Sequence, residues 1–182
     1  MKEIGARLAG SSCTFTVWAP LRKCVELHII GPTEKVVPMS RDKDGYWTVR
    51  VNGMGHGTVY RYRLDKLVER ADPASAFQPE GVHGPSMVVD HNRYVWNHSS
   101  PPTTLKDYIV YELHIGTFTN DGTFASAALR FPELSDLGIN AVEIMPVAQF
   151  PGRRNWGYDG VYPFAVQNSY GGVDDLKAFV NE

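Results

Sequence analysis

Hydrophobic and polar residues alternate along several short segments between residues 13 and 95, and this period of two predicts β-strands. The turn-forming pairs Asp44–Gly45 and Asn52–Gly53 separate neighbouring segments. The side chains predicted to face a common core are Cys13, Phe15, Val17, Val25, Leu27, Ile29, Trp47, Val49, Val51, Tyr60, Tyr62 and Leu64. Short strands with this spacing and without a helical pattern are typical of an antiparallel β-sandwich of the immunoglobulin-like type.

The alternation ends before the middle of the chain. Residues 71–93 carry several prolines and glycines, which indicates an extended arm laid against the sandwich. Residues 97–107 have the composition of a linker. We therefore predict a sandwich with its arm over residues 1–96, a linker over 97–107, and a second folded unit over 108–182.

The second unit follows a different pattern. Residues 108–115 and 139–147 are apolar enough for two buried strands, and residues 123–137 between them show helical spacing. Pro132 interrupts this spacing, so either one helix kinks there or a second short helix begins. An apolar stripe at Leu176, Phe179 and Val180 predicts a last helix over residues 173–182. The order of strand, helix, strand, loop and helix predicts parallel strands, as in a (β/α) barrel.

The loop after the second strand has an unusual composition. Residues 153–172, "RRNWGYDGVYPFAVQNSYGG", place aromatic and charged side chains between glycines. This loop leaves the carboxyl end of its strand, which is the end that carries the active site in (β/α) barrels. We therefore expect the loop to contact a ligand.

Composition narrows the remaining possibilities. The chain has 182 residues, 43% hydrophobic residues and a net charge of −2, which gives no indication of a nucleic-acid partner. It has no apolar run of the roughly 18–20 residues that span a membrane, and no N-terminal signal-peptide core, so we expect a cytoplasmic protein. If the strands containing Cys13 and Cys24 pair, Cys13 lies opposite a residue near Ile29, which disfavours a disulfide.

Several segments resemble glycoside hydrolase family 13. The stretch "FTVWAP" (residues 15–20) is similar to the first sandwich strand of that family's isoamylase and glycogen-branching group. The stretches "YELHIGTFTNDGTF" (111–124) and "LGINAVEIMPV" (137–147) resemble the first two strands of its barrel. More specific are "ADPASAFQPEGVHGPS" (71–86) and "PVAQFPGRRNWGYDGVYPFAVQNSYGG" (146–172), which resemble the members that release trehalose from maltooligosyl-trehalose.

The resemblance implies roles for the aromatic loop. It implies that Tyr158 stacks on the sugar at the cleavage point, because the C–H face of a pyranose packs well on an aromatic ring. Trp156 would support Tyr158 or line the same subsite. Arg153, Arg154 and Asp159 would either reach sugar hydroxyls or form ion pairs within the loop. An α-1,4-glucan or maltooligosyl-trehalose is the expected ligand, and we predict no cofactor, metal ion, nucleic acid or membrane as a partner.

The catalytic part of the family pattern is missing. Family members carry an Asp nucleophile, a Glu acid and a further Asp on later barrel strands, and no matching motif occurs here. A full barrel needs about 250 residues, whereas this sequence has only the first two βα units. We therefore expect an incomplete barrel without catalytic residues that is inactive alone. Its open edge, with Ile109, Tyr111, Ala141 and Ile144 on an unpartnered inner face, predicts low stability and self-association.

Five other groups of residues could suggest chemistry, and each has a simpler explanation. Glu112 and Glu143 lie mid-strand, below the rim where catalysis occurs. His114 shares a strand face with Glu112, but two ligands without a third are weak evidence of a metal site. Trp18, Trp47 and Trp96 could form a glucan platform, although alternation turns Trp47 inward. Arg50, Arg61 and Arg63 form a basic stripe that suits a solvated face. The glycines after Tyr170 lack the pattern of a phosphate-binding loop.

Three functions therefore remain open. The chain is a hydrolase fragment of the trehalose-forming type, a non-catalytic α-glucan-binding or interaction module, or an enzyme completed by another chain. The sequence also leaves open the related branching and debranching specificities. The aromatic loop favours the first function, because it belongs to a cleft wall rather than to a flat binding face.

Overall fold

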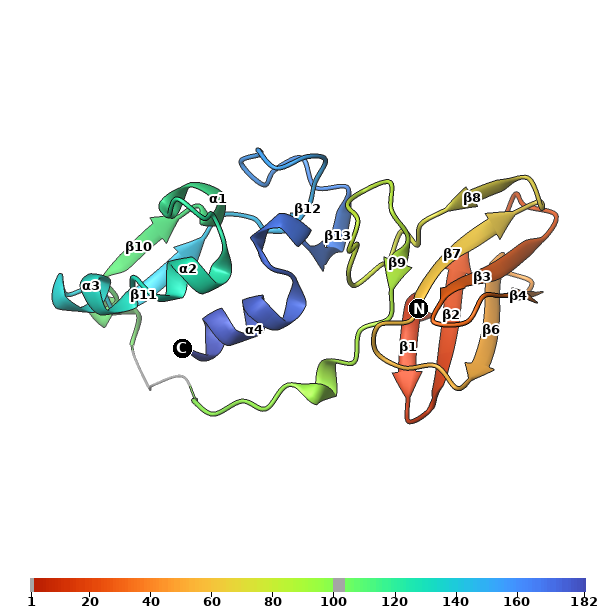
Figure 1. The fold of residues 1–182 in the computed structure, drawn as a ribbon, viewed down its shortest axis with the longest axis horizontal. Helices are drawn as coiled ribbons and strands as arrows, with labels where there is room; N and C mark the ends of the chain where they lie inside the picture. The colour runs from red at the N-terminus through yellow and green to blue at the C-terminus, as the bar shows by residue number, and fades with distance from the viewer. Residues whose placement is uncertain (1, 100–103) are drawn as a thin grey trace.

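The computed structural model describes residues 2–99 and 104–182 (Figure 1). In its first half, two antiparallel sheets pack face to face with the strand orders β1-β2-β6-β5 and β4-β3-β7-β8, and β9 also pairs with β7. The strands are β1 (Gly5–Ala9), β2 (Ser12–Trp18), β3 (Val25–Gly31), β4 (Lys35–Pro38), β5 (Ser40–Arg41), β6 (Tyr46–Asn52), β7 (Val59–Leu64), β8 (Val68–Arg70) and β9 (Ser86–Met87). This confirms the predicted sandwich and adds strands that the alternation did not reveal.

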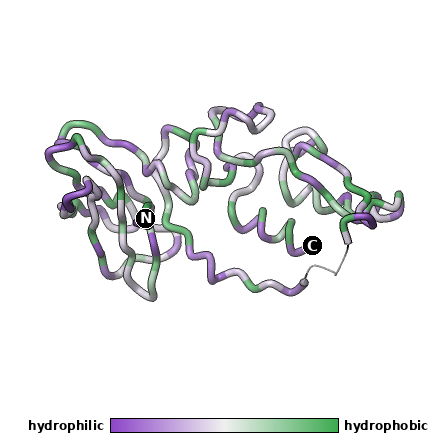
Figure 2. The backbone as a smooth tube through the Cα atoms, turned by 180° about the vertical axis from the view of Figure 1, so that it is seen from behind, coloured by the Kyte–Doolittle hydropathy of each residue, from purple (hydrophilic) through white to green (hydrophobic). Residues whose placement is uncertain are grey.

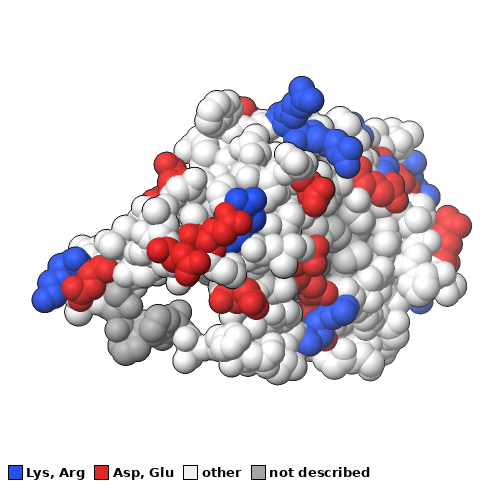
Figure 3. All heavy atoms as spheres, turned by 60° about the vertical axis from the view of Figure 1, so that its left-hand side comes forward, with Lys and Arg blue, Asp and Glu red and all other residues white. Residues whose placement is uncertain are grey.

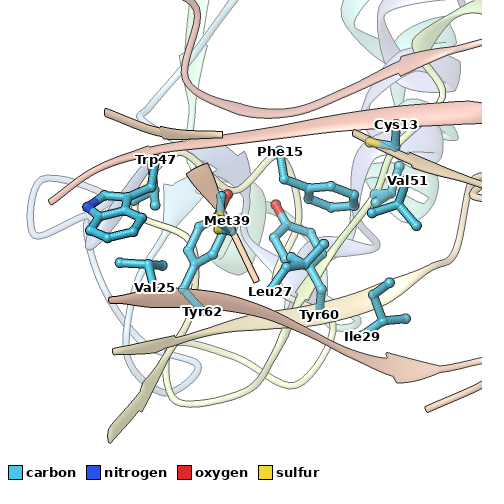
Figure 4. Packing of buried hydrophobic residues seen from close by; sticks show 12 residues of the cluster. Cys13, Phe15, Val25, Leu27, Ile29, Met39, Trp47, Val51, Tyr60 and Tyr62 are labelled. Carbon is cyan, nitrogen blue, oxygen red and sulfur yellow. The ribbon is translucent and has the colours of Figure 1, made fainter. Parts of the chain in front are cut away.

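The core of the sandwich lies where alternation placed it. Phe15 from one sheet packs edge-on against Tyr60 from the other, with ring centroids 4.8 Å apart (Figure 4). Ten of the predicted core side chains are buried, and Val49 and Leu64 are half-buried at its margin. Burial of this apolar surface, at roughly 25 cal/mol per Å², is the main stabilising contribution.

The strands that contain the two cysteines do not pair with each other. β2 pairs with β1 and β6, while β3 pairs with β4 and β7, so the two strands lie in different sheets. Cys13 is paired in register with Val51 rather than facing a residue near Ile29. Both cysteines are free, Cys13 in the core and Cys24 half-buried.

A buried carboxylate fixes the arm to the sandwich. Asp72 accepts hydrogen bonds from the hydroxyls of Tyr60 at 2.7 Å and Tyr62 at 3.2 Å, and from the backbone N–H of Ala74. Burial raises the pKa of Asp72, and the hydrogen bonds act in the opposite direction. Because two core tyrosines hold this residue, the arm begins at a defined point on the sandwich.

The second half contains two small sheets and four α-helices. The strands are β10 (Val110–Leu113), β11 (Ala141–Ile144), β12 (Ala148–Gln149) and β13 (Tyr162–Val166). The helices are α1 (Ile115–Phe118), α2 (Phe124–Ala128), α3 (Phe131–Asp136) and α4 (Val173–Asn181), with short 3₁₀ turns η1 (His91–Arg93), η2 (Leu105–Asp107) and η3 (Asn168–Tyr170). As predicted, β10 and β11 are parallel; β12 and β13 form an antiparallel pair within the region predicted to be loop.

The helices resolve the alternatives at Pro132. A second helix begins there, since Pro132 lies in the first turn of α3, where its missing N–H costs no helical hydrogen bond. Gly138, with φ of +92°, follows the end of α3, as is common for glycine after a helix. Leu137 and Val180, predicted to lie on apolar faces, are exposed. The second core instead gathers Leu113, Ile115, Phe124, Ala127, Phe150, Tyr170 and Phe179.

The register of β10 and β11 corrects the predicted inner face. Tyr111 pairs with Val142 and Leu113 with Ile144, and Leu113, Val142 and Ile144 pack in the second core. Val110 pairs with Ala141 on the opposite face. The four residues assigned to one face are therefore divided between two. Val110 and Tyr111 are exposed, so β10 is not the buried strand that its composition predicted.

A predominantly hydrophilic segment runs from the arm along α4 (Figures 1 and 2). Lys177 donates to the carbonyl of His91 at 3.0 Å, and the N–H of Asn97 donates to the Asn181 side chain at 2.8 Å. Residues 100–103 of the predicted linker lie outside the described residues. Acidic and basic side chains are interspersed on the face in Figure 3. None of the helices in the described parts of the chain is long and apolar enough to cross a membrane.

Candidate functional site

A cavity of about 410 Å³ lies between the carboxyl end of β10 and the aromatic loop. The lining residues either follow β10 or belong to the aromatic loop: His114, Gly116, Thr117, Arg153, Arg154, Asn155 and Trp156. Parallel strands with adjacent loops commonly bind ligands at this end of the sheet. The lining offers an aromatic ring, two cations and several hydrogen-bonding groups, and it includes neither Asp nor Glu.

His114 holds the loop against the end of β10. Its Nε2 lies 2.7 Å from the carbonyl oxygen of Asn155, and because a carbonyl can only accept, Nε2 carries the proton and donates. Nδ1 lies 3.2 Å from the hydroxyl of Thr117. The hydroxyl of Tyr170, a buried residue of the second core, approaches Nε2 at 3.2 Å. With both ring nitrogens engaged, His114 is a structural residue of the cavity wall.

A compact turn sets the direction of the loop. The side-chain oxygen of Asn155 accepts from the N–H of Gly157 at 2.7 Å. Gly157 has φ of +97°, and a Cβ at this position would lie 2.0 Å from the carbonyl oxygen of Pro146. The Asn155 amide also lies 3.3 Å from the carboxylate of Asp159. Asp159 therefore braces the turn by a hydrogen bond rather than by an ion pair.

The aromatic candidates differ in their positions. Trp156 lines the cavity and is 73% exposed, whereas Tyr158 is 70% exposed and lies outside the lining. Arg153 and Arg154 both line the cavity, and neither forms an ion pair with a carboxylate among the described residues. The structure thus brings Trp156 and the two arginines together, with Tyr158 on the solvent side of the same turn.

Buried amides fix the base of the loop. Gln149 and Gln167 are fully buried, and the Gln149 amide donates to Gln167 Oε1 at 2.8 Å. Two bonds then tie this base to the arm: the Asn168 amide donates to the carbonyl of Pro79, and the Tyr162 hydroxyl donates to the carbonyl of Val82. Hydrophobic patterning missed these residues, because a polar side chain in a loop carries no burial signal.

The remaining candidates have structural explanations. Glu112 and Glu143 are direct partners in the register of β10 and β11 and both are exposed, away from the cavity lining. Within the described residues, no group of three potential ligands could hold a metal ion. Trp47 is buried, as predicted, and Trp18 and Trp96 are exposed. Each arginine of the basic stripe has a partner within the chain: Arg50 donates to Ser12, Arg61 donates to the carbonyl of His83, and Arg63 forms an ion pair with Glu26.

Comparison with known proteins gives this geometry a context. Residues 3–74 match the family of carbohydrate-binding module 48 (isoamylase N-terminal domain). The chain is 45% identical over 179 residues to malto-oligosyltrehalose trehalohydrolase from Saccharolobus solfataricus, a match that covers 98% of this chain and 31% of the relative. The chain thus spans about 30% of the length of the curated relatives that it matches.

Solved structures with a similar fold point to the same group of proteins. A putative α-amylase from Salmonella typhimurium superposes with a TM-score of 0.92 at 40% identity, over 100% of this chain and 31% of that one. A pullulanase from Anoxybacillus sp., solved with maltotetraose, superposes with a TM-score of 0.77 at 28% identity, over 98% of this chain and 31% of that one. In sequence and fold, this chain is similar to the N-terminal part of the α-amylase-type glycoside hydrolases, family 13. Within that group it is similar to the malto-oligosyltrehalose trehalohydrolases.

Proposed function

We propose that this chain is the N-terminal part of a cytoplasmic enzyme of trehalose biosynthesis, one that releases trehalose from maltooligosyl-trehalose. Its own task is to form one wall of the α-glucan-binding cleft. The observation that carries the proposal is the cavity at the carboxyl end of β10, a strand parallel to β11, with Trp156, Arg153 and Arg154 in its wall. The similarity to trehalohydrolases extends over this loop, since it covers 98% of the chain.

In this proposal the aromatic ring and the polar groups have separate tasks. Trp156 packs against the C–H face of a glucosyl ring, and Tyr158 stacks on the next ring toward solvent. Arg153 and Arg154 both donate to sugar hydroxyls. Neither arginine forms an ion pair with a carboxylate among the described residues. Asp159 contributes indirectly, because its carboxylate receives the Asn155 amide and keeps the turn in place.

We further propose that residues 1–96, 97–107 and 108–182 are a sandwich with its arm, a linker, and the first two βα units of a (β/α)₈ barrel. Two observations support this division: the chain has two separate hydrophobic cores, and β10 and β11 are parallel with helices between them. Hydrolysis by a retaining glycosidase needs two carboxyl groups about 5–5.5 Å apart at the bond to be cut. Because the cavity lining has no carboxylate, we propose that the chain alone is inactive.

A second candidate function rests on Trp18. This residue is 59% exposed beside a hollow of about 470 Å³ that is also lined by Leu21, Arg22 and Arg70. An exposed indole in a hollow of a carbohydrate-binding module fits a non-catalytic α-glucan-binding function of the sandwich alone.

Titration calorimetry with maltoheptaose separates the two functions. Trp156→Ala is expected to weaken binding at least tenfold if the loop forms the site, and Trp18→Ala if the sandwich does. Trp96→Ala, which removes an exposed indole outside both hollows, is the matched control. Equal affinity in the wild type and Trp156→Ala would contradict the first function. Absence of any maltoheptaose binding would contradict both.

A further inference from the structure

The structure contains another cavity that none of the functions above uses. It has a volume of about 430 Å³ and lies between β1 of the sandwich, the end of the arm at η1, and β13 of the second half. Arg7, Ala74, Asp90, His91, Asn92 and Phe164 are among its lining residues. Phe164 belongs to the second half, and the other lining residues belong to the β1 segment and the arm, so side chains of both halves line the cavity.

One wall of this cavity is an exposed aromatic ring. Phe164 is 64% exposed, although the next residue of β13, Ala165, is buried. Ile4, Ala6 and Leu8 add apolar surface to the lining, and Ala6 and Leu8 also pack against the margin of the sandwich core. An open phenyl ring of this kind suits the C–H face of a pyranose ring.

The polar groups of the cavity suit a neutral ligand rather than an ion. Asp90 and Arg7 carry opposite charges, and the Asp90 carboxylate also accepts from the N–H of Asn92 at 2.9 Å. Burial, with Lys177 and Arg7 nearby, lowers the pKa of His91 below its usual 6.5, so this ring is neutral at pH 7. A neutral imidazole offers one donor and one acceptor, and the Asn92 amide offers both. Such groups match hydroxyls, which also donate and accept.

We propose that this cavity is a second α-glucan site, in which Phe164 stacks on a glucosyl ring while Arg7, His91 and Asn92 bond its hydroxyls. The volume falls within the roughly 300–1,000 Å³ of small-molecule sites. The choice of α-glucan rests on the proposed function. Strand addition of a peptide to the edge of β1 is disfavoured, because the arm already crosses β1 at Gly5, where an added Cβ would lie 2.9 Å from the Ala74 carbonyl oxygen.

The test is a ¹H–¹⁵N NMR titration of the whole chain with maltoheptaose, with cellohexaose as the β-linked control. We expect amide shifts at residues 4–8, 89–92 and 164 with maltoheptaose only. Phe164→Ala and Asn92→Ala should each raise the dissociation constant for this set of shifts at least fivefold. Trp156→Ala should leave it unchanged, as should Leu105→Ala, a truncation of a fully solvated side chain elsewhere.

Each result of this titration has a distinct meaning. Shifts confined to residues 153–159 would overturn the second site and leave the proposed function standing. Shifts at both regions that respond equally to cellohexaose would overturn the assignment to an α-glucan. Shifts in neither region would overturn both proposals. If Phe164→Ala lowers the melting temperature markedly, Asn92→Ala decides, because its side chain is exposed.

Discussion

His114 donates a hydrogen bond from Nε2 to the carbonyl oxygen of Asn155, 2.7 Å away and 41 residues later in the chain. This bond joins the end of β10 to the turn that carries Trp156 and Tyr158. Removing the imidazole leaves the Asn155 carbonyl without its donor and takes away the partner of the Thr117 hydroxyl. The position of the loop therefore depends on a side chain outside the loop.

His114→Ala is expected to lower the free energy of unfolding by about 1 kcal/mol, the usual net contribution of a part-buried hydrogen bond. It should also weaken maltoheptaose binding, because the loop is less well fixed. Urea denaturation and calorimetry measure the two effects. His83→Ala, at an exposed position, is the control. If His114→Ala retains wild-type stability, His114 does not hold the loop in place.

A pair of glycine variants separates backbone strain from steric collision. Gly157→Ala forces a Cβ to 2.0 Å from the Pro146 carbonyl at φ of +97°, whereas Gly152→Ala at φ of +75° meets open space. We expect Gly152→Ala to cost about 1–2 kcal/mol from the left-handed conformation alone, and Gly157→Ala clearly more. Thermal unfolding followed by near-UV circular dichroism compares them. Equal costs would show that the turn relaxes away from Pro146.

Asp72 gives the sandwich a pH dependence of defined sign. Burial raises its pKa above the ordinary 3.8, so the folded protein binds this proton more tightly than the unfolded chain does. Its contribution to stability is therefore fully present below about pH 3.8 and is lost as the pH rises through the raised pKa.

The comparison with Asp72→Asn isolates this effect, because the amide cannot titrate. The unfolding free energy of the wild type minus that of the variant should fall as the pH rises from 3 to 7. Tyr62→Phe removes one donor to the carboxylate and should extend this fall to higher pH. Urea denaturation across this range measures both differences. A difference that rises with pH would mean that the hydrogen bonds from Tyr60 and Tyr62 outweigh burial.

The sheet of the second half is expected to be less stable than the sandwich. β10 and β11 pair only with each other among the described strands, and Ile109 and Val110 are exposed. We propose that such open edges allow self-association. Hydrogen exchange should be faster at residues 110–113 and 141–144 than in β2 and β7, and light scattering should show dimers at high concentration. Equal protection of both halves in a monomer would contradict this.

The sequence predicted those parts of the fold that hydrophobic periodicity encodes. Phe15, Leu27 and Tyr60 are buried because alternating strands turn every second residue inward. Alternation does not identify the partner of a strand, so it could not show that the Cys13 and Cys24 strands lie in different sheets. Nor does composition reveal whether a short apolar strand such as β10 has neighbours on both sides.

The sequence predicted the residues of the candidate site that face the cavity, but not the residues that hold the loop in position. The composition of the loop indicated ligand contact, and Trp156 and Arg153 do line a cavity. The residues that position the loop, His114, Gln149 and Gln167, act through contacts between distant segments. Such contacts are fixed by tertiary packing, so no local pattern could have predicted them.

If an α-glucan lies against the aromatic loop, it must shield the exposed indole of Trp156 from solvent. The measurement is acrylamide quenching of tryptophan fluorescence with and without saturating maltoheptaose, in the wild type and in Trp156→Phe. We expect maltoheptaose to lower the quenching constant of the wild type. Most of this protection should be lost in Trp156→Phe. The same quenching constant with and without maltoheptaose in the wild type, or equal protection in both proteins, would contradict it.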